Sequence, residues 1–120
     1  LAAVIDSARS MEHRLAVARV ALERVGDDPG RVLMSDHPMS LAWVLDRSVM
    51  VLPDDPPSTL AELARQTGVR TLIVFDDRAP YPDVLLDQAS GTCLAAAPER
   101  LETSDEPAWL FRIDPGCGAP

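Results

Sequence analysis

Three apolar runs, RVLMS (31–35), SVMVL (48–52) and RTLIVF (70–75), decide the fold of this 120-residue chain. Each has the length of a strand and little polar alternation, which is typical of strands buried on both faces of a sheet. Between them, residues 38–46 and the segment before Gly68 carry apolar residues at helical spacing. The order strand, helix, strand, helix, strand predicts right-handed crossovers and parallel pairing.

Residues 3–25, ahead of the first strand, are expected to form a long helix. The apolar residues at three- and four-residue steps predict one stripe that covers a sheet face: Val4, Ala8, Met11, Leu15, Ala18, Leu22 and Val25. The charged residues lie largely off it: Arg9, Glu12, Arg14, Glu23 and Arg24. Gly26 and the turn residues after it end the helix.

The pattern is weaker after Asp77. Residues 83–88 are expected to form a short helix, and residues 92–96 and 108–113 to form strands. Residues 99–103 are a further candidate strand, which an acidic turn would join to the last strand as a hairpin.

These elements predict the α/β class: a small, Rossmann-like three-layer domain, with a mostly parallel sheet and a C-terminal antiparallel hairpin at its edge. Residues 1–27 would be an N-terminal helix or connector, residues 28–114 the α/β domain and residues 115–120 a flexible tail.

The composition excludes some partners. The formal net charge is −8, with no lysine, which argues against nucleic acid and against an anionic membrane surface. The eleven basic residues other than histidine are arginines scattered along the chain, so we expect no basic pocket for a lipid phosphate. No apolar run approaches the length of a membrane-spanning helix.

A candidate ligand crevice follows from the strand ends, because open α/β sheets bind ligands beyond the carboxyl ends of their strands. The residues there are Ser35, Asp36, His37, Asp54, Asp55, Asp76, Asp77 and Arg78. Clustered carboxylates suit magnesium or calcium. The same aspartates can be explained by conformational roles. Asp36 can cap a helix that has Pro38 in its first turn, Asp54-Asp55 can form a solvated turn, and Asp77 can pair with Arg78. We therefore expect no metal and no cofactor.

Other functional signatures are absent or incomplete. The first strand is followed by DHPMS and not by a glycine-rich dinucleotide loop. A phosphoacceptor domain would need a lysine. A hydrolase would rest on His37 with Ser35 or Ser40, and no nucleophile elbow surrounds either serine. Pairing between Cys93 and Cys117 stays open.

The runs GRVLMSDHPMSLAWVLDRSVMVLP (30–53), LAELARQTGVRTLIVFD (60–76) and AWLFRID (108–114) resemble a known domain. It is the C-terminal domain of bacterial membrane glycosyltransferases of the dolichyl-phosphate-mannose-protein mannosyltransferase type (family 39 and ArnT-like). The resemblance covers about residues 28–113. The matching positions are Asp36-His37-Pro38, Trp43, Arg47, Leu52-Pro53 and Gly68-Val69-Arg70, while Asp46 stands where glycine is usual.

In that family the catalytic acidic residues lie in the membrane part, so no catalytic residue carries over to this chain. The resemblance implies a non-catalytic domain on the extracytoplasmic face of a bacterial membrane. It would aid acceptor binding or cover the membrane active site. Its partners would be the membrane-embedded part of the same polypeptide and a glycan or lipid-linked acceptor. The alternative is a free-standing α/β module that binds a small ligand in the acidic crevice.

Overall fold

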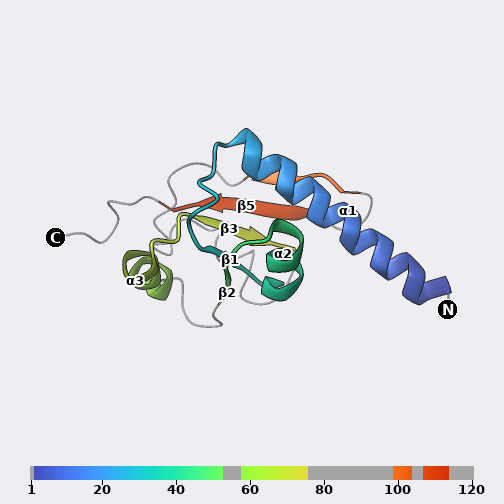
Figure 1. The fold of residues 1–120 in the computed structure, drawn as a ribbon, viewed down its shortest axis with the longest axis horizontal. Helices are drawn as coiled ribbons and strands as arrows, with labels where there is room; N and C mark the ends of the chain where they lie inside the picture. Colours follow the sequence, from blue (N-terminus) through green and yellow to red (C-terminus); the bar gives the residue numbers. More distant parts are fainter. Residues whose placement is uncertain (1, 53–57, 76–98, 104–106, 114–120) are drawn as a thin grey trace.

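The computed structural model describes residues 2–52, 58–75, 99–103 and 107–113, and Figure 1 gives their arrangement. The described strands form one five-stranded sheet in the order β2-β1-β3-β5-β4. Their bounds are β1 Leu33–Ser35, β2 Val49–Val51, β3 Thr71–Val74, β4 Glu99–Leu101 and β5 Ala108–Arg112. The first three lie within the apolar runs that predicted them.

The strand directions confirm the α/β fold and correct one detail. β1 pairs in parallel with both β2 and β3, as predicted. β5 pairs antiparallel with β3 on one side and with β4 on the other, so the C-terminal hairpin forms that edge of the sheet. The described strands therefore make an evenly mixed sheet and not a mostly parallel one, because β5 lies directly against β3.

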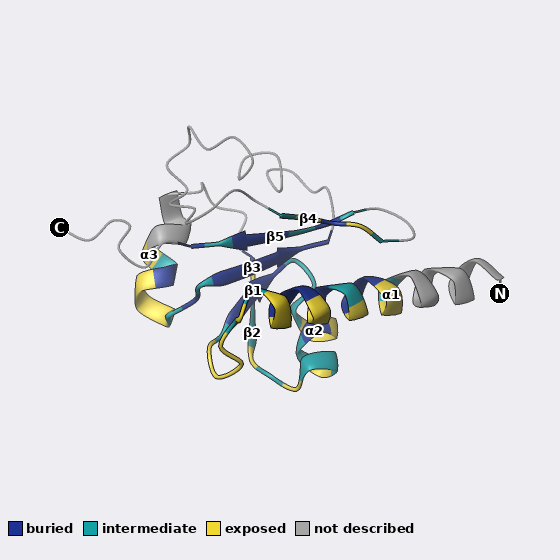
Figure 2. Ribbon diagram, turned by 90° about the horizontal axis from the view of Figure 1, so that it is seen from above, coloured by how far each residue is buried: buried dark blue, intermediate teal, exposed yellow. Residues whose placement is uncertain are grey.

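The three helices among the described residues cover the two faces of the sheet. α1 (Ala2–Arg24) and α2 (Pro38–Leu45) lie on one face and α3 (Ser58–Thr67) on the other, which gives the predicted three layers (Figures 1 and 2). The N-terminal part of α1 extends past the edge of the sheet. None of the described helices combines the length and apolar character needed to cross a bilayer.

The core consists of two clusters, one on each face. Leu15, Ala18 and Leu22 of α1 pack with Ile73 and other residues on the first face, so this part of the predicted apolar stripe is confirmed. Leu72 and Val74 pack on the other face. All three β3 residues, Leu72, Ile73 and Val74, are fully inaccessible to solvent, as expected for a strand between two layers of helices.

Left-handed residues follow all three helices. Gly26 (φ +70°) ends α1 and donates to the Glu23 carbonyl, and Gly68 (φ +80°) follows α3 and donates to the Ala64 carbonyl. After α2, Asp46 has this left-handed conformation (φ 52°, ψ 51°), and its N–H donates to the Ala42 carbonyl. Aspartate tolerates this region better than most residues, since its short polar side chain bonds locally.

Several expected features lie outside the described residues. They are the short helix at 83–88, the strand at 92–96, the tail at 115–120, and both Cys93 and Cys117. The hairpin turn around Ser104 also falls there in part, although both of its strands are described.

Leu72→Ala is expected to lower the free energy of unfolding by about 2–5 kcal/mol, because the lost burial leaves a cavity between β3 and the α3 face. Val51→Ala is the matched control, since the Val51 side chain is 65% exposed on the outer strand β2. Urea denaturation measures both. An equal, small loss in the two variants would contradict the central position of β3.

Candidate functional site

Ser35 ends β1, Asp36 and His37 follow it, and all three lie near Phe75, the residue just after β3. The Asp36 carboxylate accepts a hydrogen bond from the Phe75 N–H at 2.9 Å. The Ser35 hydroxyl accepts one from the His37 N–H at 3.1 Å and lies 3.5 Å from Asp36 Oδ1. The His37 ring meets the Phe75 ring edge-on, with centroids 5.7 Å apart. The structure thus brings these three predicted residues together, and they bond to one another and to β3.

The predicted helix cap at Asp36 is wrong. The residue at the N-cap of α2 is His37, which makes no side-chain capping bond, and Pro38 opens the helix as expected. The Asp36 side chain is 8% exposed and turns toward β3, where the Phe75 N–H needs an acceptor. His37 Nε2 lies 3.9 Å from the other Asp36 oxygen. The Phe75 N–H has no partner in the sheet ladder, so it binds the Asp36 carboxylate, which could otherwise have capped α2.

Arg14 of α1 also contacts Phe75. The sequence placed Arg14 off the buried stripe of the helix, and this expectation is wrong. The residue is buried, at 7% relative exposure. Its guanidinium donates to the Phe75 carbonyl and lies over the Phe75 ring, 5.3 Å from the centroid. The long side chain lets its aliphatic part pack in the core while the charge reaches the strand end.

The rest of the predicted crevice, Asp54, Asp55, Asp76, Asp77 and Arg78, lies outside the described residues. In the part of the chain that the structure describes, no three His, Cys, Asp or Glu residues are placed to hold a metal ion. In the described part of the crevice, the Ser35 and Asp36 side chains therefore bind the protein's own backbone, and the His37 ring contacts the Phe75 ring.

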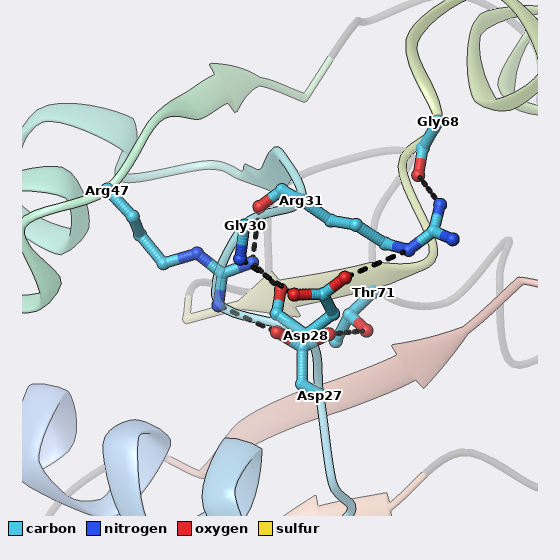
Figure 3. A network of polar contacts seen from close by, with 7 residues as sticks. All are labelled: Asp27, Asp28, Gly30, Arg31, Arg47, Gly68 and Thr71. Atoms are coloured by element: carbon cyan, nitrogen blue, oxygen red, sulfur yellow. Dashed lines mark hydrogen bonds and ion pairs between the residues drawn. The ribbon is translucent and has the colours of Figure 1, made fainter.

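A second polar cluster lies at the other end of the strands, where β1 and β3 begin (Figure 3). Asp27 follows α1; its carboxylate accepts from Arg47 at 2.7 Å and from the Thr71 hydroxyl at 2.7 Å. The Asp27 and Arg47 side chains are 2% and 9% exposed. Arg47 Nη2 also donates to the carbonyls of Asp28 and Arg31. This ion pair joins the loop before β1, the start of β2 and the start of β3.

Asp28 and Arg31 extend the cluster to α3. Asp28 Oδ1 accepts from the Gly30 N–H at 2.9 Å, and Asp28 Oδ2 lies 3.8 Å from Arg31 Nε. Arg31 also donates to the Gly68 carbonyl at 3.3 Å. Both carboxylates of the cluster therefore face an arginine, as Figure 3 shows.

A pocket of about 410 Å³ opens beside this cluster. Its lining residues are Gly26, Asp27, Asp28, Arg31, Arg70, Arg112 and Ile113. Three of the arginines that are scattered along the sequence come together here with two aspartates, and the expectation of no basic pocket for a lipid phosphate stays a prediction. We call this pocket the arginine pocket.

The sequence analysis missed Arg14, Asp27 and Arg47 as structural residues. Arg14 lies three residues after Met11 and four before Ala18, so helical spacing places it beside the apolar stripe. That position was a usable signal. Asp27 and Arg47 are twenty residues apart and lie in different loops, and no spacing rule links such a pair.

Asp36→Ala is expected to lower the free energy of unfolding by about 1–3 kcal/mol, because it leaves the buried Phe75 N–H without its acceptor. Asp36→Asn keeps an oxygen at this place and is expected to lose less. Chemical denaturation of the two variants checks the order. If both were as stable as the original chain, the contact with Phe75 would not support the fold.

Arg47→Met is expected to cost about 3–5 kcal/mol of unfolding free energy, since Asp27 would remain as a buried and unpaired charge. Arg24→Met is the matched control. It removes the ion pair with Glu99, whose side chains are 55% and 32% exposed, and is expected to cost less than about 1 kcal/mol. Similar losses in urea denaturation would show that burial does not distinguish the two pairs.

Comparison with known protein families, with curated proteins and with solved structures finds no match to this chain. The two polar clusters and the arginine pocket are therefore interpreted from their own geometry and chemistry.

Proposed function

We propose that this chain is a non-catalytic α/β domain of a bacterial membrane glycosyltransferase that uses a lipid-phosphate sugar. In this proposal it faces the extracytoplasmic side and aids acceptor binding or covers the membrane active site. The main support is the use of the strand-end side chains: Asp36 and Ser35 bind backbone N–H groups of Phe75 and His37. A general acid or base must be free to reach a substrate, and these contacts occupy both groups.

The shape of α1 supports its proposed role as a connector to the membrane-embedded part. The part of α1 from Leu15 to Leu22 packs in the core. The preceding turns extend beyond the sheet (Figure 1), and the molecule is 53 Å long against 28 and 22 Å in the other directions. A helix held at one end by the domain can carry the chain toward another body.

An exposed apolar face on α2 supports the proposed contact with that body. Met39 and Trp43 are 86% and 88% exposed and, with Ala42 and Asp46, line a shallow pocket of about 540 Å³. Their helical spacing of four places the two side chains on one face of α2. Large exposed apolar groups of this kind mark contact sites. In the proposal this face meets the membrane-embedded part or the acceptor.

The alternative is a free-standing α/β module that binds a small ligand. One observation favours it: the arginine pocket offers a concave, charged site, although at the other edge of the sheet from the crevice first expected. A binding module needs no membrane partner, so the two proposals predict different genes.

The first test is the complete reading frame that encodes this chain. The proposal expects several apolar runs of about 20 residues, each long enough to span a bilayer, upstream of residue 1. A frame that contains none of them would contradict the membrane enzyme and support the free-standing module.

The second test is a transfer assay. The purified chain, incubated with a polyprenyl-phosphate sugar and candidate acceptors, is expected to show no turnover, with or without divalent metal. Turnover that Asp36→Ala or Asp76→Ala abolishes would overturn the non-catalytic assignment. In the full-length protein, Trp43→Ala is expected to reduce transfer, whereas Val51→Ala, which alters an exposed apolar side chain on β2, is expected to leave it unchanged.

A further inference from the structure

We infer that the arginine pocket is a binding site for a phosphate group, a function beyond the role proposed above and independent of it. The argument begins with charge. Asp27 is paired with Arg47, and Asp28 bonds the Gly30 N–H and faces Arg31. These contacts account for both carboxylates of the pocket and leave Arg70 and Arg112 without a carboxylate partner among the described residues.

Arg70 is the key residue of this site. It is only partly exposed, and its guanidinium makes no hydrogen bond or ion pair with any residue that the structure describes. An anion from solution can therefore bind it without first breaking an internal contact.

Arg112 of β5 also lines the pocket, and its pairing with Thr71 places its side chain on the face of the sheet opposite to that of Arg70. Arg112 stands opposite Thr71, and the Ile113 N–H donates to the Arg70 carbonyl at 2.8 Å. Among the described residues, the Arg112 side chain donates one long hydrogen bond, of 3.4 Å, to the Val25 carbonyl just after α1. That bond offsets the partial negative charge of the helix C-terminus, which would otherwise repel an anion from the pocket.

The ligand class follows from these groups. Arg70 and Arg112 both line the pocket and lack a carboxylate partner among the described residues, and a dianion is attracted to two positive charges more strongly than a monoanion is. Guanidinium forks match the oxygens of phosphate with two parallel hydrogen bonds. A volume of about 410 Å³ exceeds that of a lone phosphate, so it has room for a larger group attached to it. We therefore assign the site to a phosphate monoester or diphosphate.

The binding test is isothermal titration calorimetry of the whole chain at constant ionic strength. The probes are inorganic phosphate, pyrophosphate and glycerol 3-phosphate, with acetate as the monoanion control. We expect saturable binding of at least one phosphate probe with a Kd of about 1 mM or tighter, and weaker binding of acetate. Absence of saturable binding by all three phosphates would overturn the assignment.

Variants locate the site. Arg70→Gln removes no contact within the described chain, so it is expected to leave the melting temperature unchanged and to weaken phosphate binding at least about tenfold. Arg100→Gln is the matched control: Arg100 is exposed on β4, pairs with Glu102 and lies outside the pocket. Binding that survives Arg70→Gln, or that falls equally in Arg100→Gln, would contradict the site.

A vesicle experiment tests whether the bound phosphate belongs to a lipid headgroup or to a free phosphate compound. Phosphatidylcholine vesicles with and without phosphatidic acid are sedimented with the chain. Sedimentation that depends on phosphatidic acid and on Arg70 assigns the site to a lipid headgroup. Arg70-dependent binding of the soluble phosphates alone assigns it to a free phosphate compound.

Discussion

The buried ion pair of Asp27 and Arg47 is the interaction on which the parallel part of the sheet depends. Asp27 is held by the end of α1, Arg47 precedes β2, and the Thr71 hydroxyl at the start of β3 bonds the same carboxylate. A buried charge pair is costly to desolvate, so its benefit depends on satisfying the remaining donors and acceptors. The Asp28 and Arg31 carbonyls and Thr71 supply most of those bonds, although Arg47 Nε has no partner among the described residues.

Asp36 has the corresponding role at the other end of β1. It joins the end of β1 to the end of β3 through the Phe75 N–H, and Arg14 of α1 binds the carbonyl of the same residue. β1 is only three residues long, so its ladder offers few hydrogen bonds. Carboxylates just outside both ends of the strand extend the connection between β1 and β3 beyond those few bonds. The acidic residues around β1 are therefore explained first by the fold.

The sequence was sufficient for the parallel unit because burial on both faces removes polar alternation from a strand, and this pattern is visible in TLIVF and VMVL. It was insufficient for the position of β5, because no local pattern states which strand a C-terminal hairpin will join. At the site, Asp36 was placed correctly at a strand end, yet its partner was not predictable. Aspartate can cap a helix or accept a hydrogen bond from the end of a neighbouring strand, and only the tertiary structure decides which of the two it does.

The position of β5 also changes where a ligand is expected. In a parallel sheet all carboxyl ends lie at one edge, which is why the crevice was sought beyond Ser35. β5 runs antiparallel to β3, so its carboxyl end at Arg112 lies opposite Thr71, at the edge where β3 begins. A mixed sheet therefore has strand carboxyl ends at both edges. At the first, the Ser35 and Asp36 side chains bind the protein's own backbone. At the second, Arg70 and Arg112 lack a carboxylate partner among the described residues. The same topology that corrects the predicted sheet thus directs the search for a ligand to the arginine pocket.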